Sequence, residues 1–350
     1  MKDTRIPLTI LTGFLGAGKT TLLNAVLSDN DNGRVAVIVN EFGEAGLDNH
    51  LIEESTDDVF LMQSGCLCCS VRGDLSNTIE ILIRKNIRKE INFERIVIET
   101  TGIADPGPIM QTLLLDKVLA STTRLDGIVT VVDALNGIAT LDTQFEAISQ
   151  AALADLIILS KTDIASPQQV QNFKSRLEKI NPTSKIIYSI KGNGIQKKIW
   201  GLNALKEKSS YKDVLNWTTG IEPKLSELDN LSGLAPAKTI SKLALKHDSK
   251  IVSCSIILDN PISNSVFDNW LDTLIEAKGS DILRIKGIVF LEKIDTPFVF
   301  HGVQHVFDPP VQLKKWPRKD RQSRIVVIAR NISQPQLQRS LDMLRIQSDN

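Results

Sequence analysis

The first half of the chain alternates between short apolar runs and segments with helical periodicity. Between residues 8 and 190, seven runs are apolar at nearly every position: LTIL, RVAVIV, DVFLM, RIVIE, GIVTVVD, DLIILS and KIIYSI. Continuous apolar runs suit strands that are buried on both faces, whereas a half-exposed strand would alternate apolar and polar residues. The pattern therefore predicts an α/β fold, with a mainly parallel sheet and helices on both of its faces.

One of the intervening segments carries a clear helical face. In residues 74–91, DLSNTIEILIRKNIRKEI, apolar side chains recur three or four positions apart, at Leu75, Ile79, Leu82, Ile83, Ile87 and Ile91. Such spacing places the side chains on one side of a helix.

A second unit follows a change in composition. Between about residues 216 and 250 the pattern gives way to TTGIEPKLSELDNLSGLAPAKT, which is rich in Gly, Pro, Ser and Thr and typical of a linker. Beyond it, strands are predicted at 251–258, 283–291, 298–303 and 324–329, and helices at 265–277 and 334–344. The sequence thus predicts a first domain at 1–215, a linker at 216–250 and a smaller α+β domain at 251–350.

Composition and charge argue against some partners. Lys plus Arg and Asp plus Glu number 41 each, so the summed charge gives no long-range attraction to nucleic acid or anionic lipid. The apolar run near Met1 is short and interrupted by Gly13 and Gly16, unlike a signal peptide, and no run is long enough to span a membrane. We expect a cytoplasmic protein without a nucleic-acid or membrane partner.

The segment GFLGAGKT, residues 13–20, fits the phosphate-binding pattern G-x-x-x-x-G-K-[ST]. It lies between a predicted strand and a helical segment, which disfavours the alternative of a Gly-rich turn without a ligand. Glycines let backbone N–H groups turn inward around an anion, and the helix N-terminus adds the positive end of its dipole. We predict that Lys19 reaches the β- and γ-phosphates and that the Thr20 hydroxyl binds Mg²⁺.

Two acidic segments also follow predicted strands. NEFGEAGLD, residues 40–48, is interpreted either as a switch that becomes ordered with γ-phosphate and Mg²⁺ or as an ordinary acidic surface loop. In IVIETTG, Glu99 ends a buried strand and can hold the Mg²⁺ shell, while the N–H of Gly102 can sense the γ-phosphate.

A third segment, LILSKTD, points to the base of the nucleotide. An Asp at position 163 can accept hydrogen bonds from two N–H groups of guanine, whereas N1 of adenine is an acceptor and would leave the carboxylate unpaired. The sequence therefore favours GTP over ATP.

Three of the four cysteines, Cys66, Cys68 and Cys69, lie in the single segment GCLCC. Their thiolates suit zinc or copper(I), and three ligands leave one position open, as suits a metal that is exchanged. A redox dithiol and a buried structural cluster remain alternatives. Cys254 stands alone in a predicted strand, and we expect it to be a small core residue.

Together, LTGFLGAGKTTLLN, NEFGEAGLD, GCLCC, ETTGIADP and SKTD resemble, in order and spacing, the CobW-type family of P-loop GTPases. ILRIKGIVFLEKIDTPFVFHGVQHVFD and RIVVIARNI are similar to the C-terminal domain of that family. The resemblance implies a P-loop NTPase sheet followed by a smaller α+β domain. It also implies a metallochaperone that holds Zn²⁺ at the C-x-C-C motif and passes it to a client metalloprotein in a cycle of GTP binding and hydrolysis.

The resemblance also implies roles for single residues, with the reaction carried by Lys19, Thr20 and Glu99. The sites it implies are phosphate contacts at Gly13, Gly16, Ala17, Gly18, Lys19, Thr20 and Thr21, a γ-phosphate sensor at Gly102, guanine contacts at Lys161 and Asp163, and metal ligands at Cys66, Cys68 and Cys69. Glu41 is implied as an additional ligand of this metal or of the Mg²⁺ shell.

Two features depart from the family pattern. The guanine motif usually begins with Asn, and Ser160 stands there instead, with a shorter side chain to brace the loop. The histidine-rich stretch that many members carry near the linker is missing, and only His247 is nearby. No arginine finger or water-positioning glutamine is evident, so we expect slow intrinsic hydrolysis.

Some alternatives stay open at this stage. One is a cobalt-related accessory GTPase, acting with Co²⁺ in cobalamin synthesis or nitrile hydratase activation. Another is a redox-sensing GTPase that uses the same thiols. The sequence does not identify the client protein or the oligomeric state.

Overall fold

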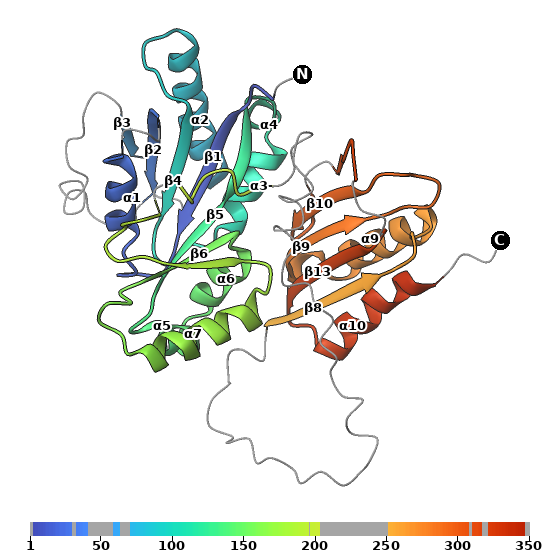
Figure 1. Cartoon of the computed structure of the whole chain (residues 1–350). Coiled ribbons are helices and arrows are strands. Elements are labelled where there is room, and N and C mark those ends of the chain that lie inside the picture. The colour runs from blue at the N-terminus through green and yellow to red at the C-terminus, as the bar shows by residue number, and fades with distance from the viewer. Residues whose placement is uncertain are drawn as a thin grey trace.

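The structure is a computed structural model that describes residues 3–29, 33–40, 59–63, 71–195, 197–203, 251–307, 310–316 and 321–346. In this part of the chain, a seven-stranded sheet has the order β3-β2-β4-β1-β5-β6-β7, with every pair parallel (Figure 1). Its strands are β1 (Ile6–Thr12), β2 (Val35–Asn40), β3 (Val59–Gln63), β4 (Arg95–Thr100), β5 (Thr123–Asp133), β6 (Leu156–Ser160) and β7 (Lys185–Tyr188). All seven predicted strands are confirmed.

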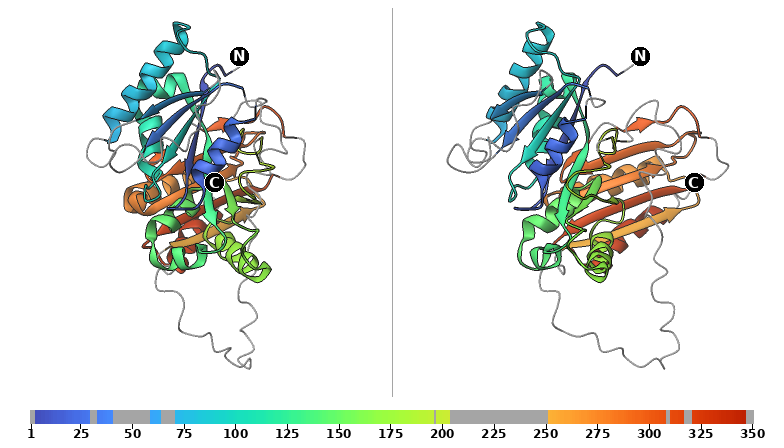
Figure 2. Two further views of the ribbon diagram at one scale, coloured as in Figure 1. Left: turned by 90° about the vertical axis from the view of Figure 1, so that its left-hand side faces the viewer. Right: turned by 60° about the vertical axis from the view of Figure 1, so that its left-hand side comes forward.

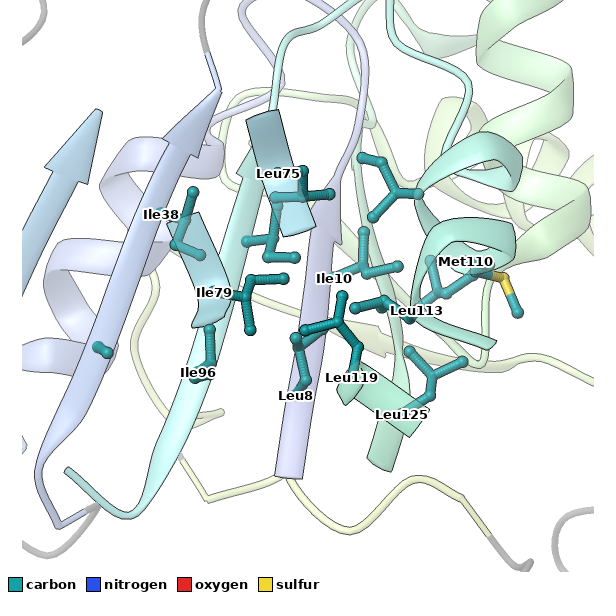
Figure 3. Close-up of a cluster of buried hydrophobic side chains, with 14 of the residues drawn as sticks. Leu8, Ile10, Ile38, Leu75, Ile79, Ile96, Met110, Leu113, Leu119 and Leu125 are labelled. Atoms are coloured by element: carbon teal, nitrogen blue, oxygen red, sulfur yellow. The ribbon is translucent and has the colours of Figure 1, made fainter. Parts of the chain in front are cut away.

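Helices cover both faces of this sheet, as the continuous apolar runs predict. They are α1 (Lys19–Leu27), α2 (Val71–Ile87), α3 (Gly107–Leu115), α4 (Lys117–Thr122), α5 (Gly137–Thr143), α6 (Phe145–Leu153) and α7 (Pro167–Ile180). Successive strand residues point to opposite faces, so Val97 packs with α1 while Ile96 and Ile98 pack with α2 and α3. Figure 3 shows the apolar cluster on the face that carries Ile96, in which Leu8 and Ile10 of β1 lie among side chains of α2, α3 and α4.

The apolar face predicted for residues 74–91 is confirmed as far as Ile83, and Ile91 still packs against the same cluster although it lies beyond the helix. Leu75, Ile79, Leu82 and Ile83 are buried, but Ile87 is 73% exposed. Helix α2 ends at Ile87. Just beyond it, Lys89 takes a left-handed conformation with φ 60°, and the N–H of Glu90 donates to the carbonyl of Lys85, 3.0 Å away. This C-terminal cap turns the chain away before the periodicity ends.

The second unit is an antiparallel sheet of the order β11-β10-β9-β13-β8, with β12 paired to β10. Its elements are β8 (Ile251–Leu258), α9 (Asn264–Lys278), β9 (Ile282–Val289), β10 (Phe298–Val303), β11 (Val306–Phe307), β12 (Val311–Gln312), β13 (Ser323–Arg330) and α10 (Gln334–Asp342). The four predicted strands and both predicted helices are confirmed. The two-residue strands β11 and β12 were not predicted, because such short strands carry no periodic pattern.

Helices α9 and α10 cover one face of this second sheet, around a core that contains Trp270 and Leu337. On its other side, Leu283 of β9 and Ile328 of β13 share a buried cluster with residues of α6. The second sheet therefore lies against the first unit, as two further views show (Figure 2).

Several predicted features lie outside the described residues. They are the linker at 216–250, the acidic segment from Glu41 to Asp48, and the thiols of Cys66, Cys68 and Cys69. The domain boundaries at 215 and 250 stay predictions. In the described part of the chain, none of the helices has the length and apolar character needed to cross a membrane.

Candidate nucleotide site

The P-loop joins β1 to α1 and folds tightly against β5. Gly13 has φ +142°, and a Cβ atom there would lie 2.2 Å from the carbonyl oxygen of Val131, so only glycine fits. The Lys19 Nζ donates to the carbonyl oxygen of Gly13 at 2.9 Å, which holds the ammonium group against the loop that precedes it. The lysine side chain therefore lies folded back on the loop that is predicted to bind phosphate.

Thr20 and Glu99 come together although they are 79 residues apart in the chain. Strands β1 and β4 are neighbours, with Leu11 paired to Glu99, so the end of β4 lies beside the start of α1. The Thr20 hydroxyl donates to Glu99 Oε1 at 3.0 Å, and Glu99 is only 5% exposed. A hydroxyl and a carboxylate are hard oxygen donors, which is the donor set that Mg²⁺ prefers.

The loop after β4 packs directly on the P-loop. A Cβ atom at Gly102 would lie 2.5 Å from the backbone nitrogen of Leu15. The strands beneath are also tied together, because the Thr100 hydroxyl donates to the Thr12 hydroxyl at 2.8 Å. The close approach of Gly102 therefore brings its peptide group to the edge of the P-loop.

Ser160 links the predicted guanine motif to the P-loop. Its hydroxyl donates to the carbonyl of Ala17 at 2.6 Å and also lies 3.1 Å from the carbonyl of Val132. The short side chain that replaces the usual Asn therefore still reaches the loop that it is expected to brace.

Lys161 forms an ion pair that sequence reasoning missed. Its Nζ lies 2.7 Å from Oδ2 of Asp133, the last residue of β5, which pairs in register with Ser160. Burial raises the pKa of the Asp133 carboxyl, but hydrogen bonds from Lys161 and from Asn136 outweigh it and hold this pKa below its usual value. The sequence signal that could have identified Asp133 is an acidic residue at the end of a buried strand. Asp163 is exposed.

Ser189 was also missed, since no motif in the sequence marks it. It follows β7, the neighbour of β6, and its N–H donates to the carbonyl of Leu159 at 2.9 Å. Ser189 is 4% exposed, and among the residues that the structure describes its hydroxyl has no hydrogen-bond partner. Three residues later the same loop meets α1, because a Cβ atom at Gly192 would lie 2.5 Å from Cβ of Ala25. The loop after β7 therefore brings a buried hydroxyl to the side of the guanine motif.

The predicted metal ligands Cys66, Cys68, Cys69 and Glu41 all lie outside the described residues. Within the described ranges, His, Cys, Asp and Glu form no group of three or more that could hold a metal ion. Cys254 is buried in β8, where its Sγ lies 3.6 Å from the carbonyl of Gln334, as expected for a core residue.

Comparison with known proteins agrees with this geometry. Residues 7–188 match the CobW/HypB/UreG nucleotide-binding domain, and residues 251–345 match the C-terminal domain of the cobalamin synthesis protein CobW. The chain belongs to the CobW family of P-loop GTPases. Both units of this CobW-family chain are covered by the two matches.

Individual relatives extend over most of the CobW-family chain. It is 32% identical to the zinc chaperone YjiA of Escherichia coli over 302 residues, which cover 86% of this chain and 87% of that one. It is 33% identical to the zinc-regulated GTPase metalloprotein activator 1 of Schizosaccharomyces pombe, over 93% of this chain and 83% of that one. The crystal structure of Zn(II)-bound YjiA GTPase from E. coli superposes with a TM-score of 0.73, at 25% identity, over 98% of this chain and 99% of that one.

Proposed function

We propose that this chain is a GTP-dependent metallochaperone that carries zinc on Cys66, Cys68 and Cys69 and passes it to a client metalloprotein. The observation that carries the nucleotide half of this proposal is the hydrogen bond between Thr20 and Glu99 at the P-loop. The cargo half is supported by the relatives that are named zinc chaperones, YjiA among them.

The phosphate end of GTP would lie in the P-loop. Lys19 would stabilise negative charge on the β- and γ-phosphates, and the N–H of Gly102 would face the γ-phosphate. Thr20 and Glu99 would hold Mg²⁺, which when bound neutralises charge on the phosphate oxygens. Hydrolysis would be slow, because the sequence offers no evident arginine finger or glutamine to orient the attacking water.

The guanine base would be recognised by the segment after β6. The exposed carboxylate of Asp163 would accept hydrogen bonds from guanine, and Lys161, held by Asp133, would lie beside the base. Because adenine cannot donate from N1, this carboxylate would discriminate against ATP. The loop that carries Ser189 follows the neighbouring strand β7 and lies beside this segment.

The order of strands offers a route from nucleotide to metal. Strand β2 lies between β4 and β3, with Val39 paired both to Glu99 and to Gln63. In the chain, Glu41 follows the end of β2 and the thiols follow the end of β3. Both segments therefore begin at the edge of the sheet where the carboxyl ends of the parallel strands lie, and Glu99 is near the carboxyl end of β4. A change at Glu99 on nucleotide exchange would therefore occur beside the strand ends that precede both segments, and Glu41 is proposed as an additional metal ligand.

Metal titrations in defined nucleotide states test the proposal. Zn²⁺ and Co²⁺ would be titrated anaerobically into wild type and into the triple variant Cys66→Ser, Cys68→Ser, Cys69→Ser, each with GDP and with a non-hydrolysable GTP analogue. We expect the triple variant to lose high-affinity binding, and wild-type affinity to differ between the two nucleotides, since such coupling is reciprocal. Equal affinity in all four states would overturn the metallochaperone hypothesis, and reversible disulfides without metal binding would favour a redox role.

A further inference from the structure

Helix α6 holds the loop that follows β4. The side chain of Gln150 is 1% exposed, and its Nε2 donates to the carbonyls of both Gly102 and Ala104, at 3.1 and 3.0 Å. Both hydrogens of one amide are thus used on one loop. The backbone carbonyl of Gln150 accepts from the Thr130 hydroxyl at 2.9 Å, which fixes the helix to β5 at the same residue.

A second contact from α6 holds the end of the same loop. The Ser149 hydroxyl lies 3.4 Å from Oδ1 of Asp105, which also accepts from the N–H of Gly107 at 2.9 Å. On its other side the loop meets the P-loop, because Gly102 packs against Leu15. The loop from Gly102 to Asp105 therefore lies between the P-loop and α6.

The other end of α6 is bound to the second sheet. Arg284 of β9 donates to the carbonyl of Leu153, the last residue of α6, and pairs with Asp155 two residues later. Lys286 also pairs with Asp155, with Nζ 2.8 Å from Oδ1. The side chains of both cations are 1% exposed, so this is a buried charge cluster between the two units.

Asp155 is fixed on the first unit as well. Its Oδ2 accepts from the N–H of Ile128 in β5 at 3.0 Å. Burial raises the pKa of the Asp155 carboxyl, but the charges of Arg284 and Lys286 outweigh it and hold this pKa well below its usual range. Asp155 is therefore ionised at neutral pH, and a buried charge that lost its partner would be costly.

Apolar packing makes the helix a close fit between the units. Ala147, Ile148, Ala151 and Ala152 are buried, and the three small alanine side chains let backbones approach closely. Close-packed interiors transmit a displacement rather than absorb it, so α6 can relay a shift from one unit to the other.

We propose that Gln150 is a positioning residue for the GTPase reaction and that the second sheet, through Arg284, fixes the helix that carries it. Nucleotide state at Gly102 and the position of the second sheet are then linked, and the linkage acts in both directions. This inference rests on the proposed role of Gly102 in sensing the γ-phosphate.

The Gln150→Met variant of the full chain tests the first step. Methionine has a similar length but no N–H donor. We expect kcat for GTP to fall by about tenfold or more while affinity for GDP, which has no γ-phosphate, stays within about twofold. A role in stability alone would instead lower the melting temperature and weaken both nucleotides alike, and that result would overturn the proposal.

The Arg284→Met variant tests the second step, with Arg324→Met as a matched control, since Arg324 donates a hydrogen bond to Gln322 within the second unit. We expect Arg284→Met to lower the ratio of GTP-analogue affinity to GDP affinity by about three- to tenfold, and Arg324→Met to leave it unchanged. Arg284→Lys keeps the charge, and serves if the methionine variant does not fold. It is expected to lower the ratio by less.

The outcomes separate the two proposals. Wild-type protein that neither hydrolyses GTP nor distinguishes the analogue from GDP would remove the proposed nucleotide function and this inference with it. Wild-type discrimination that persists undiminished in Gln150→Met and in the Arg284 variants would overturn this inference alone.

Discussion

The hydroxyl of Ser160 donates a hydrogen bond of 2.6 Å to the carbonyl oxygen of Ala17, which joins the end of β6 to the P-loop. The same hydroxyl lies 3.1 Å from the carbonyl of Val132 at the end of β5. Three neighbouring segments of the site therefore meet at one side chain. Ser160 has a shorter side chain than the usual Asn, but its hydroxyl still forms a hydrogen bond with the P-loop.

Removing this hydroxyl is expected to weaken nucleotide binding. Ser160→Ala leaves the Ala17 carbonyl without its donor, and a neutral hydrogen bond contributes about 1 kcal/mol, so affinity for GDP and for a GTP analogue is expected to fall by about fivefold each. Fluorescent-nucleotide titration measures it. Ser166→Ala is the matched control, because Ser166 caps α7 and its loss is expected to lower stability only. Unchanged nucleotide affinity in Ser160→Ala would contradict a role of this hydrogen bond in nucleotide binding.

Neutralising Glu99 is expected to raise the Mg²⁺ requirement. Glu99→Gln keeps an oxygen that can accept from Thr20 but removes the charge, so we expect the Mg²⁺ concentration for half-maximal GTP hydrolysis to rise by about tenfold. Glu80→Gln, which alters the surface ion pair with Arg84 on α2, is the control. An unchanged Mg²⁺ dependence would remove Glu99 from the metal shell.

Adding one methyl group at Gly102 is expected to disturb the γ-phosphate end of the site. The new Cβ of Gly102→Ala would lie 2.5 Å from the Leu15 nitrogen, so the loop or the P-loop must move. Since small displacements of reacting groups cost up to about 10²-fold in rate, we expect kcat to fall by about ten- to a hundredfold. Affinity for the GTP analogue should fall more than affinity for GDP. Equal losses would argue that Gly102 does not face the γ-phosphate.

The buried cluster between the units predicts a dependence of stability on pH. Burial and the like charge of Arg284 lower the pKa of Lys286 to about 8, although Asp155 opposes this, and His301 lies opposite Lys286 on β10. Between pH 8 and the unfolded value of 10.5 the unfolded chain keeps a proton that the folded chain has lost, so this group makes the free energy of unfolding rise with pH.

The size of this rise can be measured with a lysine control. It is limited to about 1.4 kcal/mol per pH unit for one group, and urea unfolding at several pH values between about 8 and 10 would detect it. Lys286→Met should remove the rise, whereas Lys174→Met, at a surface pair of α7, should retain it. The same dependence of the free energy of unfolding on pH in both variants would contradict the lowered pKa of Lys286.

The sequence predicted the elements better than the contacts between them. Continuous apolar runs predicted all seven strands of the first sheet, since burial on both faces leaves a direct mark on composition. The end of α2 was wrong, because the apolar period continues past Ile87 while the cap at Lys89 ends the helix. The C-terminal cap at Lys89, and not the spacing of apolar residues, determines where α2 ends.

The site was predictable where a motif carries the chemistry. The P-loop spacing predicts Lys19 and Thr20, but their roles stay predictions, as do those of the thiols outside the described residues. Asp133 and Gln150 could not be found in this way. Their partners, Lys161 and Gly102, are brought to them only by the order of strands and the packing of α6.

The buried charge cluster also has a consequence for how such chains can be recombined. Asp155 belongs to the first unit, while Arg284 and Lys286 belong to the second. A chimera that joined this first unit to a foreign second unit would bury a carboxylate without its counter-charges, unless that unit carried cations at the same positions of its sheet. The two units are therefore expected to be inherited as a matched pair.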